Sequence, residues 1–265
     1  MKITAEANTD IGTKKAVNQD AVLVKQANTV DYGRIVLGVV ADGMGGLSCG
    51  EVASASFVKR MDDWFKRELP EILSNTGATE QLAGDEELRS YDVFNAIKNQ
   101  WYQIATTMND KIKAYGISHG IRLGTTCVCL FVMDKSYLVM NVGDSRAYSF
   151  GENRLDLITH DQSYVQQQID LGRMTREEAE KSSEKSVLLQ CVGASDVVIP
   201  DFFQGSCKSI DNFLLCSDGF WRRLKETEII EHAKEAGGLK LLTELDKERG
   251  EVDNISAIVI STEEE

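Results

Sequence analysis

The sequence predicts an α+β fold in which two packed antiparallel sheets are flanked by helices. Short apolar, β-branched segments follow one another closely enough to form hairpins, and two long helical patterns are contiguous in the chain. Strands that alternated with helices would instead have predicted a parallel sheet. No internal repeat, low-complexity tract or Pro/Gly linker interrupts the pattern, so residues 1–265 are expected to form one domain.

The expected strands are short apolar runs. Residues 34–41 are almost continuously apolar, which is typical of a strand buried on both faces. Turn residues separate 125–132 from 135–141, and 146–150 from 155–158, so each pair is expected to form a hairpin. The remaining strands are expected at 212–216 and 254–260.

Apolar residues at helical spacing predict long helices over 51–69 and 92–115, with a polar loop at 74–90 between them. Four shorter helices are expected further along the chain, at 163–171, 176–181, 226–236 and 239–247.

The composition excludes several functional classes. Acidic residues outnumber basic ones by 42 to 29, which gives a formal charge of −13 and argues against nucleic acid or an anionic membrane as the main partner. The longest apolar runs are too short to span a bilayer, and no signal peptide is visible at the N-terminus. The six cysteines lack C-x-x-C spacing, so reduced thiols in a cytoplasmic protein are expected.

Acidic residues stand beside Gly or Asn at the ends of several apolar segments. They occur in Asn18-Gln19-Asp20, Asp42-Gly43-Met44-Gly45-Gly46, Gly143-Asp144-Ser145-Arg146, Ser217-Asp218-Gly219 and Asp253-Asn254. A carboxylate at the end of a buried strand is costly unless it is paired or binds a metal. Converging carboxylates also repel one another unless a cation neutralises them.

Hard divalent cations prefer carboxylate, carbonyl and water oxygens. The chain has only three histidines, none next to these acids, so a zinc site built on imidazole is not expected. The residues therefore predict a pair of Mg²⁺ or Mn²⁺ ions that activate a water molecule.

In order and spacing, these motifs, together with Gly124-Thr125-Thr126, resemble the metal-dependent protein phosphatase family (PPM, type 2C) over residues 8–262. The resemblance implies a four-layer α-β-β-α sandwich. It also implies hydrolysis of phosphoserine and phosphothreonine in proteins by a water that bridges two Mn²⁺ or Mg²⁺ ions.

The resemblance also implies a role for each acid. Asp42 resembles the carboxylate that bridges the two metals, and the Gly43 carbonyl resembles a ligand to one of them. Asp218 and Asp253 resemble further ligands, and Asp20 resembles the acid that holds metal-bound water. Asp144, with Asp218, resembles the site of a third metal found in bacterial members.

Three further features bear on substrate binding. Lys15 stands where the family usually has an arginine, and we expect it to contact phosphate as a point charge, with the neighbouring Lys14 as a second candidate. Met44 stands where eukaryotic members have a histidine, and it cannot donate a proton. Residues 163–190 correspond to the family's flap, a loop beside the site that is expected to take part in substrate recognition.

Two alternatives remain open at this point. Cys216 and Arg222 form a C-x-x-G-x-x-R pattern, which resembles the loop of cysteine-dependent phosphatases. The domain could also bind phosphoproteins without turnover, although all the expected ligand acids are present. Phosphoprotein substrates, a cognate Ser/Thr kinase and a monomeric state are expected as well, the kinase by family analogy alone.

Overall fold

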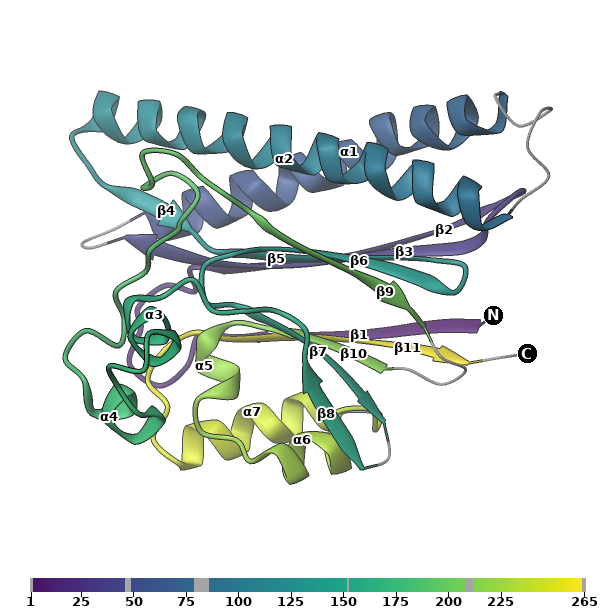
Figure 1. Ribbon diagram of the computed structural model, residues 1–265. Coiled ribbons are helices and arrows are strands. Elements are labelled where there is room, and N and C mark those ends of the chain that lie inside the picture. Colours follow the sequence, from purple (N-terminus) through teal and green to yellow (C-terminus); the bar gives the residue numbers. More distant parts are fainter. Residues whose placement is uncertain (1, 46–48, 79–85, 152, 208–211, 264–265) are drawn as a thin grey trace.

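Two antiparallel sheets pack face to face at the centre of the molecule, and helices cover both outer faces in this computed structural model (Figure 1). The structure describes residues 2–45, 49–78, 86–151, 153–207 and 212–263. The arrangement confirms the predicted α+β class and the order helix, sheet, sheet, helix.

Each sheet combines strands from distant parts of the chain. The first has the order β1 (Lys2–Asp10), β11 (Ile255–Glu263), β10 (Asn212–Cys216), β7 (Arg146–Gly151) and β8 (Arg154–Leu157). The second has the order β2 (Asp20–Thr29), β3 (Gly33–Gly45), β5 (Cys127–Met133), β6 (Ser136–Val142) and β9 (Asp201–Ser206), and the short β4 (Leu123–Thr125) pairs with the end of β3. Both predicted hairpins are present, as β5–β6 and β7–β8.

The helices divide between the two outer faces. The long helices α1 (Gly50–Ala78) and α2 (Glu86–His119) cover the second sheet, whereas α5 (Asp218–Trp221), α6 (Glu226–His232) and α7 (Gly238–Glu248) lie against the first (Figure 1). The small helices α3 (Tyr164–Asp170) and α4 (Arg176–Lys181) lie at the end of the sandwich that is opposite both termini (Figure 1). No helix in the described part of the chain is long and apolar enough to cross a membrane.

Strand β3 is apolar on both faces because it separates two hydrophobic layers. Ile35 and Leu37 pack under α1 and α2 with Trp64 and Trp101, whose rings meet edge to face at 5.4 Å. Val36, one residue away, points the other way, into the layer between the two sheets. A third apolar cluster fills the space between the first sheet and helices α5 to α7.

Some boundaries differ from the prediction. Both long helices extend beyond the expected ranges, and α1 continues through Pro70, so the predicted loop at 74–90 is wrong for 74–78 and 86–90, while 79–85 lie outside the described residues. Strands β1, β2, β4 and β9 were not expected. Strand β1 buries only Ile3 fully, because it is an edge strand whose side chains are mostly polar.

Asp246 in α7 is an exception to the apolar packing of this layer. Its side chain is fully buried, and neither carboxylate oxygen has a hydrogen-bond partner among the described residues. Burial, followed by the nearby negative charge of Glu251, raises the pKa of Asp246 to about 8, although Arg249 and Arg223 oppose the shift. The folded protein therefore keeps this carboxyl protonated at neutral pH.

This protonation predicts a pH-dependent stability. Folded Asp246 holds its proton up to about pH 8, whereas an unfolded Asp releases it near 3.8, so the favourable contribution present at low pH is lost as pH rises through this window. The Asp246→Asn side chain cannot ionise. The free energy of unfolding of this variant minus that of the wild type should therefore increase by up to about 1.4 kcal/mol for each unit that the pH rises. Urea unfolding of both proteins from pH 5 to 8 checks this; a constant difference would contradict it.

Candidate active site

Five carboxylates from distant segments meet at one end of the sandwich, where strands of both sheets begin or end. Asp20 opens β2 and lies directly opposite Asp42 on β3. Asp144 follows β6 in the turn to β7, Asp218 opens α5 directly after β10, and Asp253 lies two residues before β11. The five acids singled out in the sequence are therefore brought together.

The carboxylates lie close enough to raise one another's pKa values. Burial raises the pKa of Asp42 well above its usual value, and the charges of Asp20, Asp218, Asp144 and Asp253 raise it further. Burial likewise raises the pKa of Asp20 to about 7 and that of Asp144 to about 8, with Asp218 as a repelling neighbour of each. The site thus disfavours ionised carboxylates unless positive charge is supplied.

Two cationic side chains of the protein reach into this acidic cluster. The Lys15 ammonium lies 2.5 Å from an oxygen of Asp253, and its pKa is raised by Asp253, Asp42 and Asp218, which outweigh its own burial. Arg222, one helical turn after Asp218, forms an ion pair with it. Lys15 was predicted at the site, whereas Arg222 had been considered only in the cysteine alternative.

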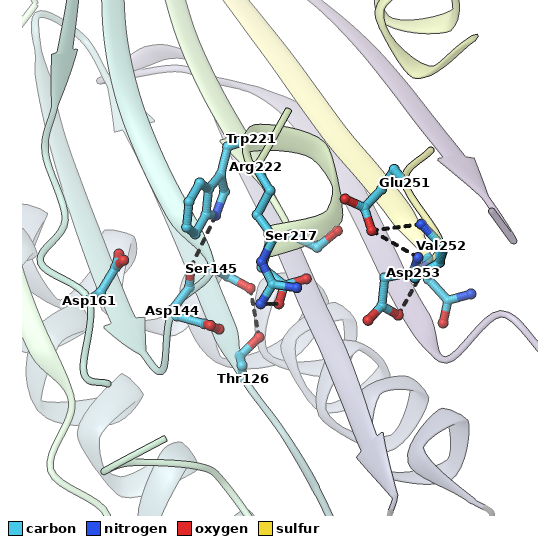
Figure 2. A network of polar contacts seen from close by, with 12 residues as sticks. Thr126, Asp144, Ser145, Asp161, Ser217, Trp221, Arg222, Glu251, Val252 and Asp253 are labelled. Carbon is cyan, nitrogen blue, oxygen red and sulfur yellow. Dashed lines mark hydrogen bonds and ion pairs between the residues drawn. The ribbon is translucent and has the colours of Figure 1, made fainter. Parts of the chain in front are cut away.

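An aromatic and ionic stack supports the turn that carries Asp144. The Arg146 guanidinium lies 3.3 Å from the ring centre of Trp221 and donates to both oxygens of Asp161, at 2.9 and 2.7 Å. The Trp221 indole Nε1 in turn donates to the Asp144 backbone carbonyl at 3.4 Å, a contact visible in Figure 2. Neither Trp221 nor Asp161 was predicted as a site residue, and their contacts emerge only from the fold.

Hydrogen bonds with uncharged side chains hold Asp20, Asp42 and the segment next to Asp253 in place. The Ser217 hydroxyl donates to Asp20 at 2.8 Å, and the Thr126 hydroxyl accepts from the Asp42 backbone N–H at 3.1 Å. Asn254 accepts from the Gln19 N–H and donates to the carbonyls of Ile11 and Val17, which holds the loop carrying Lys15 against the start of β11. Ser217, Thr126 and Asn254 lie inside the quoted motifs, so their neighbours in sequence were the available signal.

The donor set fits a hard divalent cation. One oxygen each of Asp20 and Asp218 is buried without a hydrogen-bond partner in the described part of the chain. Such orphaned carboxylate oxygens are costly unless a cation binds them. Among the described residues, no three His, Cys, Asp or Glu side chains lie close enough together to coordinate a metal ion in their present positions.

Gly43 allows three backbone segments to approach one another beside Asp42. A Cβ atom at this position would overlap the carbonyl oxygens of Gln19 and Gly50. The Gly43 N–H donates to the Gln19 carbonyl at 3.1 Å, which fixes β3 against the start of β2. Gly46 of the same motif lies outside the described residues.

Cys216 is not placed as a nucleophile. It lies within β10, is fully buried, and packs among the apolar residues of the layer under α5 to α7. Burial raises the pKa of its thiol far above the usual value, although Arg146 opposes the shift. A phosphatase cysteine needs the opposite, an accessible thiolate of lowered pKa. Arg222 is engaged with Asp218 instead of a phosphate loop.

Comparison with known proteins places the chain in a family. Residues 12–247 match the family described as protein phosphatase 2C, and the chain belongs to it. It is 30% identical over 261 residues to the serine/threonine phosphatase stp of Listeria welshimeri, covering 97% of this chain and 94% of that protein. Family and relatives confirm the enzyme class predicted from the sequence, a protein-serine/threonine phosphatase.

Solved structures show the same fold. The serine/threonine phosphatase Stp1 from Staphylococcus aureus superposes with a TM-score of 0.81 at 27% identity, covering 100% of this chain and 96% of that one. The catalytic domain of the phosphatase PstP, in complex with 2 manganese ions, superposes with a TM-score of 0.67 at 23% identity, covering 99% of each chain. At that identity the second match shows the fold alone.

The packing at Gly43 leads to a prediction about stability. Gly43→Ala should lower the free energy of unfolding by about 1–3 kcal/mol, because backbone atoms of two neighbouring segments must move to make room. Gly151→Ala is the matched control, since a Cβ there meets nothing within 4 Å. Urea unfolding compares the two variants, and equal midpoints would show that the close approach at Gly43 is not needed.

Proposed function

We propose that this protein hydrolyses phosphoserine and phosphothreonine in proteins with the help of divalent cations, Mn²⁺ or Mg²⁺, held by the acidic cluster. The observation that carries the proposal is the convergence of five carboxylates from distant segments, in four of which, Asp20, Asp42, Asp144 and Asp218, burial and neighbouring negative charge raise the pKa. A solvated acidic surface would leave such groups near their usual pKa.

The residues divide the work by position. Asp42, Asp218 and Asp253, with the Gly43 carbonyl, would hold two cations, and Asp144 with Asp218 would hold a third. When bound, such cations stabilise charge on phosphoryl oxygens and activate water. Asp20, whose second oxygen is fixed by the Ser217 hydroxyl, is placed to orient a water molecule through its unpartnered oxygen. The PstP structure in complex with manganese shares the fold that brings these residues together.

Lys15 is placed to bind the phosphate group of the substrate. The Lys15 side chain is 38% exposed and its ammonium contacts Asp253 in the carboxylate cluster, so it can reach an incoming phosphate while it stays close to Asp253. As a point charge it fixes the phosphate less tightly in orientation than an arginine would, because a guanidinium donates two parallel hydrogen bonds.

Several expectations remain proposals. They are a single domain over residues 1–265 with a recognition flap at 163–190, a monomeric state, a cytoplasmic location and a cognate Ser/Thr kinase. The flap contains α3 and α4, and its start is tied to the site because the Gln162 side chain accepts from the Gly143 N–H at 3.0 Å. This contact supports a flap that is coupled to the turn carrying Asp144.

The mechanism is tested on a phosphothreonine peptide with Mn²⁺ and then with EDTA. We expect wild-type activity that needs the metal, a loss of at least about 100-fold in Asp218→Asn, and near wild-type activity in Cys216→Ser. Activity that survives EDTA and is abolished in Cys216→Ser would establish the thiolate mechanism. A folded protein that never turns over would favour the binding module.

The role of Lys15 is tested against its neighbour. Lys15→Ala should raise KM for the phosphopeptide about tenfold, as expected when a charge-assisted contact to phosphate is lost, with a smaller change in kcat. Lys14→Ala, next to it in an exposed position, is the control and should change KM less than about twofold. Steady-state kinetics at saturating Mn²⁺ separate the two constants, and an unchanged KM in Lys15→Ala would assign Lys15 to Asp253 alone.

A further inference from the structure

Glu251 is a buried acid next to the predicted metal ligand Asp253. Its side chain is 4% exposed, and its two oxygens have separate partners. One oxygen accepts from the backbone N–H groups of Val252 at 2.8 Å and Asp253 at 3.0 Å (Figure 2). The other oxygen lies 3.0 Å from Nε of Arg223. The carboxylate thus sits between the backbone that carries Asp253 and a cation from the segment after α5.

The backbone of Glu251 is itself fixed at both polar groups. Its N–H donates to the Asp246 carbonyl at 3.0 Å, at the end of α7, and its carbonyl accepts from the Thr13 hydroxyl at 2.7 Å. Arg223 is fixed as well, because its carbonyl accepts from Arg249 at 2.8 Å. Besides the N–H groups of Val252 and Asp253, Glu251 is therefore held by three other segments, at Asp246, Thr13 and Arg223.

We propose that Glu251, held by Arg223, is a positioning residue that sets the orientation of Asp253 for metal binding; this inference depends on the metal site proposed above. The Glu251 oxygen accepts from the Asp253 N–H itself, so it fixes the peptide plane from which the Asp253 side chain departs. The Asp253 carboxylate then accepts from the Asn254 N–H at 2.9 Å and lies against Lys15.

The size of the expected effect follows from similar contacts around metal ligands. Groups that orient a ligand commonly change metal affinity by about 10–100-fold when they are removed. Removal of Glu251 would also leave the N–H groups of Val252 and Asp253 without this partner at a partly buried turn, which lets that turn reorganise. The charge of Glu251 could attract metal directly, so the experiment has to separate position from charge.

Glu228 provides a matched control in the same helical layer. Its carboxylate accepts from the Lys225 backbone N–H at 2.9 Å and pairs with both terminal nitrogens of Arg249, at 2.6 and 2.7 Å. Glu228 and Glu251 therefore share the combination of a backbone N–H and an arginine. Only Glu251 contacts the backbone of Asp253.

The test is Mn²⁺ binding by titration calorimetry on the full chain, with urea unfolding in EDTA as the measure of stability. We expect Glu251→Ala to raise the Mn²⁺ Kd by about 10–100-fold. Glu251→Gln, whose amide oxygen can still accept both N–H bonds, should stay within about threefold of wild type. Glu228→Ala should lose stability but keep its Mn²⁺ Kd within about twofold of wild type.

Three results would overturn the inference: a Glu251→Ala Kd within about twofold of wild type, a Glu251→Gln Kd as weak as that of Glu251→Ala, or an equal loss in Glu228→Ala. If Glu251→Ala does not fold, Arg223→Met decides, because that side chain is 44% exposed and tolerates replacement. It should weaken Mn²⁺ binding several-fold, and an unchanged Kd would overturn the inference. A wild type that binds no Mn²⁺ would instead overturn the proposed metal site.

Discussion

Mutual repulsion among five clustered carboxylates is the constraint on which the site depends. Desolvation and neighbouring negative charges raise the pKa values of Asp20, Asp42, Asp144 and Asp218 together. Such an arrangement opposes folding, so it has to be held by favourable interactions elsewhere. Three hydrophobic layers supply them, one under each set of helices and one between the sheets. The rigid sandwich keeps the acids close, and any cation that binds them relieves the repulsion.

The acids are distributed over both sheets, and this makes the seam between the sheets the functional edge. Asp20 and Asp42 come from the sheet under α1 and α2, whereas Asp218 and Asp253 flank strands β10 and β11 of the other sheet. Cross-links between the two halves are polar and specific, as in the hydrogen bond from Ser217 to Asp20 and that from Gln19 to Asn254. The relative position of the sheets therefore sets the distances between the carboxylates.

How much the sequence predicts depends on whether a signal is local. The apolar run at 34–41 predicts a buried strand because it is short and rich in β-branched residues, and the acids at strand ends are conspicuous because burial makes them costly. Strand β1 carries little apolar signal, since an edge strand needs few buried side chains. Arg222, Trp221 and Glu251 gain their roles from partners that only the fold brings near. The chemistry was therefore predictable where it lies in motifs, and its supporting contacts were not.

The positively charged side chains at the site are paired with neighbouring carboxylates. Lys15, Arg222 and Arg146 each contact a carboxylate, of Asp253, Asp218 and Asp161, so little of their field extends beyond the cluster. The formal charge of −13 dominates further out, and solvent ions screen it beyond about 8 Å at physiological ionic strength. An acidic phosphoprotein thus gains no long-range attraction from this surface, and its recognition has to come from short-range contacts with the phosphate and the residues around it. The same short range explains why the orientation of single groups such as Asp253 matters. Without long-range electrostatic attraction of the substrate, the positions of the contacting groups have to provide the specificity.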